Sequence, residues 1–144
     1  MKISKVRSVK TPTRGTSRSA GIDFYVPEGF TETVLPGCSC LIPSGIKANV
    51  PSGFALVAFN KSGVAVKKNF HVGACVVDED YQGEIHINLT NVGVDPQKIS
   101  QGEKIIQFVL LPVNYDIIEE VEVEKLFEEL SERGEGGFGS TGTE

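Results

Sequence analysis

Glycine and proline divide this chain into short segments, and that division limits its fold more than any other feature. Sixteen glycines and seven prolines are spread over 144 residues, with short apolar segments between them. Many short strands separated by turn residues are typical of a sandwich, barrel or jelly roll. With 40% hydrophobic and 23% charged residues, the composition fits a globular domain, and we predict an all-β fold.

Several segments carry the pattern of a strand. Residues Glu84 to Thr90 alternate, with Ile85, Ile87 and Leu89 on one face. Ile46 to Val50 alternates in the same way. Phe54 to Phe59 and Lys104 to Val113 are apolar on both faces, which predicts strands buried on both sides or at a subunit contact.

The last part of the chain has a different composition. Val123, Leu126, Phe127 and Leu130 have helical spacing, yet Val121 and Val123 alternate with glutamate, so we expect a strand that runs into one or two helical turns. Glu119 to Glu132 is acidic, and residues 133–144 are rich in glycine. We therefore predict a domain over 1–132 and a flexible C-terminal arm over 133–144.

Net charge and cysteine content limit the classes of partner and the cellular compartment that this chain fits. The formal net charge is −5 and no Lys/Arg run is present, which argues against a nucleic-acid polymer as partner. The odd number of cysteines favours a reducing compartment, and no apolar run is long enough for a membrane span. We expect a soluble protein of the cytoplasm or nucleus. Cys38, Cys40 and Cys75 lack further ligands for zinc and are expected to be half-buried strand residues.

Three internal segments combine residue types suited to water or phosphate chemistry. In Gly73 to Glu84, Asp78 follows an apolar stretch, which predicts a hairpin whose carboxylate could deprotonate a water; a polar turn is the alternative. Lys61-Ser62-Gly63 offers a cation, a hydroxyl and an amide to a phosphate, without the spacing of a Walker loop. Asp23 fits either a site or a turn cap.

The glycine-rich arm contains one cation and one aromatic ring. Arg133 offers a fork for phosphate oxygens, and Phe138 could stack on a planar ring. Ser140 and Thr141 add hydroxyl donors. A frayed terminus is the alternative reading of this composition.

In this order, and together with Gly102 to Gln107, these segments resemble the motifs of the homotrimeric dUTPase family. The resemblance extends from Pro12 to the end of the chain, and its most specific parts are Val77 to Gly83 and Arg133 to Gly142. It implies a distorted jelly-roll or β-clip barrel and a homotrimer with active sites between subunits, each closed by a neighbour's arm. It also implies Mg²⁺-dependent hydrolysis of dUTP to dUMP and pyrophosphate, which limits uracil in DNA and supplies dUMP for dTMP synthesis.

The resemblance also assigns roles to single residues. Asp78 would activate the water that attacks the α-phosphorus, Tyr81 would lie under the deoxyribose and exclude a 2′-hydroxyl, and Asp23 would hold Mg²⁺ through water. The expected uracil contacts are Gly73, Ala74, Cys75, Val76, His86 and Phe138. The expected phosphate contacts are Lys61, Ser62 and Gly63 from a second subunit, with Gln107 assisting, and Arg133, Gly139, Ser140 and Thr141.

Three features depart from the family pattern. Lys61 stands where the family usually has Arg, Cys75 stands where Gly is common, and Val121 to Glu132 is longer than usual. The alternatives to an active dUTP pyrophosphatase are a regulatory or protein-binding member with little turnover and a related dCTP deaminase. Asp78, Tyr81 and the arm favour the pyrophosphatase.

Overall fold

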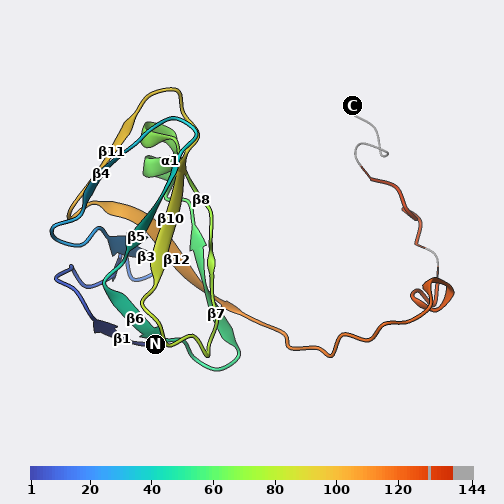
Figure 1. Ribbon diagram of the computed structural model, residues 1–144. Coiled ribbons are helices and arrows are strands. Elements are labelled where there is room, and N and C mark those ends of the chain that lie inside the picture. Colours follow the sequence, from blue (N-terminus) through green and yellow to red (C-terminus); the bar gives the residue numbers. More distant parts are fainter. Residues whose placement is uncertain (130, 138–144) are drawn as a thin grey trace. The chain divides into compact units, whose positions relative to one another are not determined.

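The computed structural model describes residues 1–129 and 131–137 (Figure 1). The chain forms two compact units, residues 1–114 and 115–144. The predicted boundary between residues 132 and 133 stays a prediction. In the first unit the strands, in chain order, are β1 (Lys2–Lys5), β2 (Thr13–Arg14), β3 (Ile22–Tyr25), β4 (Thr31–Val34), β5 (Ser39–Pro43), β6 (Ile46–Asn49), β7 (Phe54–Phe59), β8 (Phe70–Val72), β9 (Val76–Val77), β10 (His86–Asn91), β11 (Gln97–Ser100) and β12 (Lys104–Pro112), and the helix α1 (Ser62–Lys68) lies between β7 and β8.

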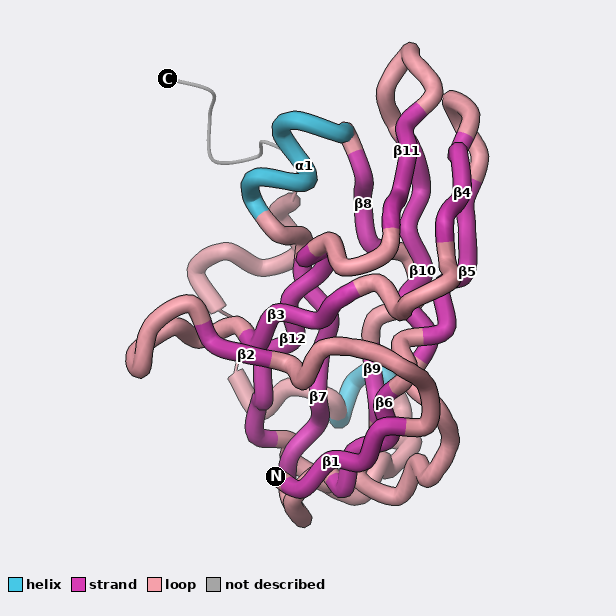
Figure 2. The backbone as a smooth tube through the Cα atoms, turned by 90° about the vertical axis from the view of Figure 1, so that its left-hand side faces the viewer, coloured by secondary structure: helices cyan, strands magenta, loops and turns pink. Residues whose placement is uncertain are grey.

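The strands of the first unit form four sheets. The largest has the order β2-β3-β12-β7-β9, a second has the order β5-β10-β8, and β4–β11 and β1–β6 are two-stranded. Every pairing in them is antiparallel. In both views the β4–β11 pair lies at one end of this unit and the β1–β6 pair at the other (Figures 1 and 2).

The predicted strands are confirmed within a residue or two at their ends. Ile85, Ile87 and Leu89 are 2%, 0% and 1% exposed, as their alternation predicts. β12 is hydrogen-bonded to β3 along one edge and to β7 along the other, so it is a central strand of the largest sheet. Phe24 of β3 packs on Phe108 of β12 with ring centroids 4.5 Å apart, and this contact lies in the core of the unit.

Helix α1 is not predicted by the sequence pattern. It follows Lys61, whose backbone is extended, and it ends at Asn69, which has a left-handed conformation with φ of 52°. Asn tolerates this conformation better than most residues and therefore serves as a helix C-cap. The sequence pattern does not indicate this helix because Val64 and Val66 are β-branched, and β-branched residues are more common in strands. Figure 2 shows α1 next to β8.

The predicted hairpin around Asp78 is wrong. β9 pairs with β7, whereas β10 pairs with β5 and β8, so the two strands that flank the acidic turn belong to different sheets. Residues 73–85 thus form a wide connection from β8 to β10 that crosses to the edge of β7. The strands on either side of this connection do not pair with each other, so it is not the tight turn of a β-hairpin.

The second unit has little regular structure in its described residues, 115–129 and 131–137. They contain one 3₁₀ turn, Val123–Lys125, and no strand. The expected strand near Val121 is therefore wrong for this chain, since a strand needs a hydrogen-bonded neighbour. In the described part of the chain, no helix is long and apolar enough to cross a membrane.

Candidate functional site

A pocket of about 200 Å³ opens at the wide connection between β8 and β10. Its lining brings together most of the residues predicted to surround uracil, the sugar and the attacking water. The predicted lining residues are Ala74, Cys75, Val76, Asp78, Tyr81 and His86, and Val77, Ile85 and Phe108 complete the wall.

The pocket wall is fixed to the sheet by backbone hydrogen bonds. The carbonyl of Cys75 accepts from the N–H of Ala58 on β7 at 2.7 Å, and the N–H of Gly73 donates to the carbonyl of Asn88 at 3.0 Å. A Cβ at Gly73 would overlap the side-chain amide of Asn88, so a larger residue there would have to displace that amide. Gly73 supports the wall and is not itself among the lining residues.

The acidic turn presents Asp78 to solvent at the pocket. The N–H of Tyr81 donates to the carbonyl of Asp78 at 3.2 Å and closes the turn. The neighbouring Glu79 accepts from the N–H of Gly53 and from the hydroxyl of Ser52 at 3.4 Å, which ties the turn to the β6–β7 loop. Asp78 is exposed, so a water molecule has access to its carboxylate.

A second group of predicted residues gathers around Asp23 of β3. Asp23 is only 5% exposed. Its Oδ1 accepts from the Nζ of Lys61 at 2.9 Å, and its Oδ2 is 3.1 Å from the Nζ of Lys104. Gln107 of β12 pairs in register with Asp23, and its Nε2 donates to the carbonyl of Asn60 at 2.9 Å. These four residues form the Asp23 cluster.

The charges of the Asp23 cluster determine its ionisation. Burial raises the pKa of Asp23, but hydrogen bonds and charge from Lys61 and Lys104 outweigh this effect, so the pKa of this carboxyl lies below its ordinary value. The Lys104 pKa is raised, first by its hydrogen bond to Asp23. Asp23 is therefore a carboxylate at neutral pH.

The sequence predicts no role for Lys104, although this residue lies within the Gly102 to Gln107 motif. In a regular strand, residues three apart point to opposite faces, so Lys104 and Gln107 would not meet. The β12–β3 register shifts between Lys104 and Ile106, and this irregularity brings both side chains to the face of Asp23. Ile105 and Ile106 are both buried. Two adjacent residues of this strand thus both lie in the core, as a bulge allows.

The pocket and the Asp23 cluster lie on opposite faces of the five-stranded sheet. Gln107 belongs to the Asp23 cluster, whereas its neighbour Phe108 lines the pocket. Successive side chains of a strand point to opposite faces. A ligand in the pocket of one chain is therefore separated from the Asp23 cluster of that chain by the sheet.

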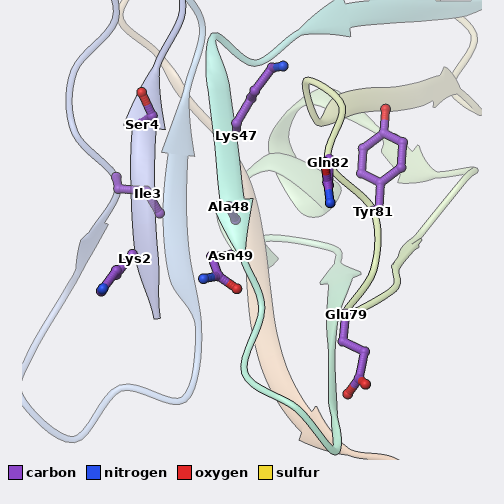
Figure 3. Close-up of a pocket in the computed structure, with 9 residues that line it drawn as sticks. All are labelled: Lys2, Ile3, Ser4, Lys47, Ala48, Asn49, Glu79, Tyr81 and Gln82. Carbon is purple, nitrogen blue, oxygen red and sulfur yellow. The ribbon is translucent and has the colours of Figure 1, made fainter.

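A larger pocket of about 440 Å³ lies beside the first (Figure 3). It lies between β1, β6 and the Glu79 to Gln82 loop, and its only residue predicted to act in the site is Tyr81. The smaller pocket, which contains the predicted constellation, is therefore the better candidate for the chemistry.

The remaining predicted residues belong to the second unit. The Nε of Arg133 donates to the carbonyl of Gly136 at 2.7 Å. The predicted contacts Phe138, Gly139, Ser140 and Thr141 lie outside the described residues. Within residues 1–129 and 131–137, no three His, Cys, Asp or Glu side chains come together as a metal site. Cys40 is buried in β5, whereas Cys38 and Cys75 are exposed and lie outside strands, so the expectation of half-buried strand cysteines is wrong.

Comparison with known proteins is consistent with this geometry. A family model described as dUTPase matches residues 7–142. The deoxyuridine 5′-triphosphate nucleotidohydrolase of Mus musculus is 37% identical over 131 residues, which cover 91% of this chain and 77% of the relative. The enzyme of the same name from Anaplasma marginale (strain St. Maries) is 38% identical over 138 residues, which cover 92% and 88%.

Solved structures confirm the predicted all-β jelly-roll fold. A mutant dUTPase from Staphylococcus bacteriophage 80alpha with dUpNHpp aligns with a TM-score of 0.87 at 24% identity, over 98% of this chain and 97% of that chain. A mutant dUTPase from phage phi11 of S. aureus, described with a coordinated structural Mg(II) ion, aligns with a TM-score of 0.76 at 20% identity, over 84% and 95%.

Proposed function

The chain belongs to the dUTPase family and is a dUTP nucleotidohydrolase, and we propose that Asp78 and Tyr81 act on dUTP in the pocket between β8 and β10. The observation that carries this proposal is the lining of that pocket. Six residues expected around uracil, the sugar and the attacking water line one cavity, although their segment does not fold as the expected hairpin.

Asp78 is the group that directs the attacking water. Its exposed carboxylate lies at the pocket next to Tyr81. A carboxylate in this place accepts the proton of a water molecule as that water attacks the α-phosphorus in line with the leaving pyrophosphate. The bond from the α-phosphorus to the bridging oxygen breaks, and dUMP and pyrophosphate are the products.

Tyr81 and the backbone of the pocket select the substrate. The ring of Tyr81 lies under the deoxyribose and leaves no space for a 2′-hydroxyl. Backbone groups near Ala74, Cys75 and Val76 pair with uracil, whose N3–H donor lies between two carbonyl acceptors. Cytosine would leave such buried groups unpaired, and a site of this kind can reject the wrong ligand by about 10⁴-fold.

Lys61, Ser62, Gly63 and Gln107 contact the phosphates. The N–H groups of Ser62 and Gly63 open helix α1 and have no partner within the helix. Lys61 is 30% exposed and bonds to Asp23, so it can turn towards a phosphate. Since Lys104 stays on the second oxygen of Asp23, the buried carboxylate is not left unpaired, which would be costly.

The Asp23 cluster fits a Mg²⁺ ion held through water once Lys61 has turned from Asp23 towards a phosphate, because both carboxylate oxygens otherwise contact a lysine. Each carboxylate oxygen of Asp23 has a lone pair beyond its lysine contact, and Mg²⁺ usually keeps several waters and binds substrate phosphates. Asp23 would hold the hydration shell of the ion. When bound, Mg²⁺ would neutralise charge on the departing pyrophosphate.

A homotrimer with shared sites accounts for the separation of the two groups. Because the pocket and the Asp23 cluster of one chain lie on opposite faces of a sheet, one nucleotide meets both only if a second chain supplies the cluster. Ile117 and Ile118 are 94% and 98% exposed in the single chain, which supports their burial against another subunit. Arg133 and Phe138 of an arm would then close the site, with Gly139, Ser140 and Thr141 over the phosphates.

Pyrophosphate release from each dNTP and from UTP, with Mg²⁺ present, tests this proposal. We expect turnover of dUTP alone, and Asp78→Asn protein serves as the inactive control. Comparable turnover of dCTP or UTP would contradict the proposed selectivity. Release of ammonia from dCTP would indicate the deaminase, and intact dUTP would favour the regulatory alternative.

A further inference from the structure

Glu84, which precedes β10, has every oxygen of its carboxylate engaged. Its Oε1 accepts from the Nε of Arg7 at 2.7 Å and from the N–H of Gly45 at 2.8 Å, and its Oε2 accepts from the Nη2 of Arg7 at 3.1 Å. The contact with Arg7 is thus a two-point pair, the geometry that orients a carboxylate most firmly. The Glu84 side chain is 14% exposed and that of Arg7 is 50% exposed, so the carboxylate is mostly covered while water reaches its partner.

The partners of Glu84 are themselves fixed. Gly45 has φ of 74°, and a Cβ there would collide with the side chain of Val9 and crowd that of Arg7, so this position requires glycine. The carbonyl of Gly45 accepts from the N–H of Val6 at 2.8 Å. Glu84 is therefore tied both to the segment after β1 and to the turn between β5 and β6.

The backbone carbonyl of Glu84 contacts two residues of the pocket. It accepts from the hydroxyl of Tyr81 at 2.9 Å, and the Nδ1 of His86 lies 3.0 Å from the same oxygen. A carbonyl can only accept, so Nδ1 carries a hydrogen, and in the neutral ring Nε2 is left as an acceptor. A Cβ at Gly83 would overlap the Tyr81 ring, so glycine also leaves space for this ring position.

We propose that Arg7 and Glu84 are positioning residues for sugar selection, because they fix the carbonyl that holds the Tyr81 hydroxyl. This inference rests on the proposed role of Tyr81 under the deoxyribose. Figure 3 shows Tyr81 on the exposed loop beside the larger pocket, where the ring is 45% exposed. Because few neighbours pack against this ring, the hydrogen bond from its hydroxyl to the Glu84 carbonyl holds it in the position that excludes a 2′-hydroxyl.

The ionisation of the pair is consistent with this role. The pKa of Glu84 is lowered mainly by the hydrogen bond from Arg7, against an opposing effect of burial. The pKa of Arg7 is raised by the same contact. The pair is charged at neutral pH, so the anchor is intact where hydrolysis is measured.

The test compares binding of dUMP and UMP by calorimetry in the full-length protein. In Glu84→Gln an NH₂ group replaces one carboxylate oxygen, so it faces either the Nη2 donor of Arg7 or the donors of Arg7 Nε and Gly45. Arg7→Ala removes the two-point pair. Each should reduce the preference for dUMP about tenfold, because misplacement of a contacting group by a fraction of an ångström has effects of this order. Arg7→Lys should recover part of the preference. The double variant should be no worse than either single variant, since both act through one carbonyl.

The matched control is Glu28→Gln. Glu28 is an exposed carboxylate that accepts at 2.6 Å from the hydroxyl of Ser8, the residue that follows Arg7 in the sequence. The preference of the Glu28→Gln protein for dUMP over UMP should equal that of the wild type. The kinetic readout is the ratio of kcat/KM for dUTP and UTP, which a loss of stability alone would leave unchanged.

Three outcomes would overturn the inference. One is an unchanged preference for dUMP in folded Arg7→Ala and Glu84→Gln. Another is an equal loss of affinity for dUMP and UMP, which indicates a purely structural pair. The third is an equal loss of preference in Glu28→Gln. If Arg7→Ala does not fold, the ratio of dUMP to UMP affinity is measured in Arg7→Lys instead, and an unchanged ratio there would overturn the inference. Wild-type protein that does not distinguish the two nucleotides would remove the proposed function as well, and this result is separate from the others.

Discussion

Mixing two inactive variants should restore activity if Asp78 and Lys61 act on one nucleotide from different chains. Asp78→Asn removes the carboxylate proposed to direct the water, and Lys61→Ala removes a proposed phosphate contact of the Asp23 cluster. In one chain these residues lie on opposite faces of the five-stranded sheet, because Gln107 and Phe108 are neighbours on β12. In the proposed trimer, each variant alone therefore forms only defective sites, whereas a trimer that contains both variants can form an intact one.

The expected recovery follows from this separation. A site is intact when its pocket comes from a Lys61→Ala chain and its Asp23 cluster comes from an Asp78→Asn chain. In a random equal mixture each condition holds for half of the chains, so about a quarter of the sites should be intact in a closed symmetric ring. If both residues served one site from one chain, no mixture would contain an intact site.

The assay is pyrophosphate release from dUTP after the two variants have been unfolded together and refolded. Native mass spectrometry measures how completely the chains have mixed. A mixture of Asp78→Asn with wild type is the control, and it should keep about half of the wild-type rate per chain because half of the pockets are intact. Complete mixing without activity above the sum of the parents would refute the shared site.

Further expectations concern stability, the arm and the cysteines. Burial raises the pKa of Asp23 and its two lysine contacts lower it more, so its stabilising effect is complete above about pH 4 and is lost as pH falls through the lowered folded-state pKa. Asp23→Asn should therefore lower Tm by several degrees at pH 7, where loss of its charged hydrogen bonds costs about 2 kcal/mol, and by less at pH 3; calorimetry showing an equal difference at both pH values would contradict this. Removal of residues 133–144 should reduce dUTP turnover by about 100-fold or more, since a closing segment completes the site, while sedimentation still shows a trimer; an unchanged rate would mean that the arm has no role. Burial and, second, the charge of a nearby glutamate raise the pKa of Cys40 to about 11, so iodoacetamide at pH 8 should modify Cys38 and Cys75 in the folded protein and Cys40 only after unfolding, as mass spectrometry would show.

The parts of the fold that the sequence predicts are those set by local periodicity. The alternation around Ile87 places its buried face correctly, and Phe54 to Phe59 matches β7 residue for residue. Turn residues divide the chain into strands because their backbone preferences act locally. The family motifs also locate Asp78, Tyr81 and Lys61 without any three-dimensional information.

The arrangement of these elements depends on contacts that the sequence does not encode locally. β9 joins β7 instead of β10 because pairing is decided by which edges meet in the folded chain. Helix α1 forms despite its β-branched valines, and the irregularity in β12 reverses the expected direction of Lys104. Arg7 is far from Glu84 in sequence, so their pairing is invisible without the structure.

The same distinction explains why motifs that follow one another in sequence form two half-sites. The resemblance predicts that Lys61 and Asp78 reach one ligand from different subunits, and within a single chain the Asp23 cluster and the Asp78 pocket lie on opposite faces of the sheet. Because successive side chains of a strand point to opposite faces, Phe108 lies in the core and at the pocket, whereas Gln107 lies on the opposite face. One β-strand thus contributes to both half-sites, and a change in its register would displace both together. If the proposed shared site is correct, assembly of chains rather than folding of one chain creates the active site, and catalytic activity should then depend on subunit association.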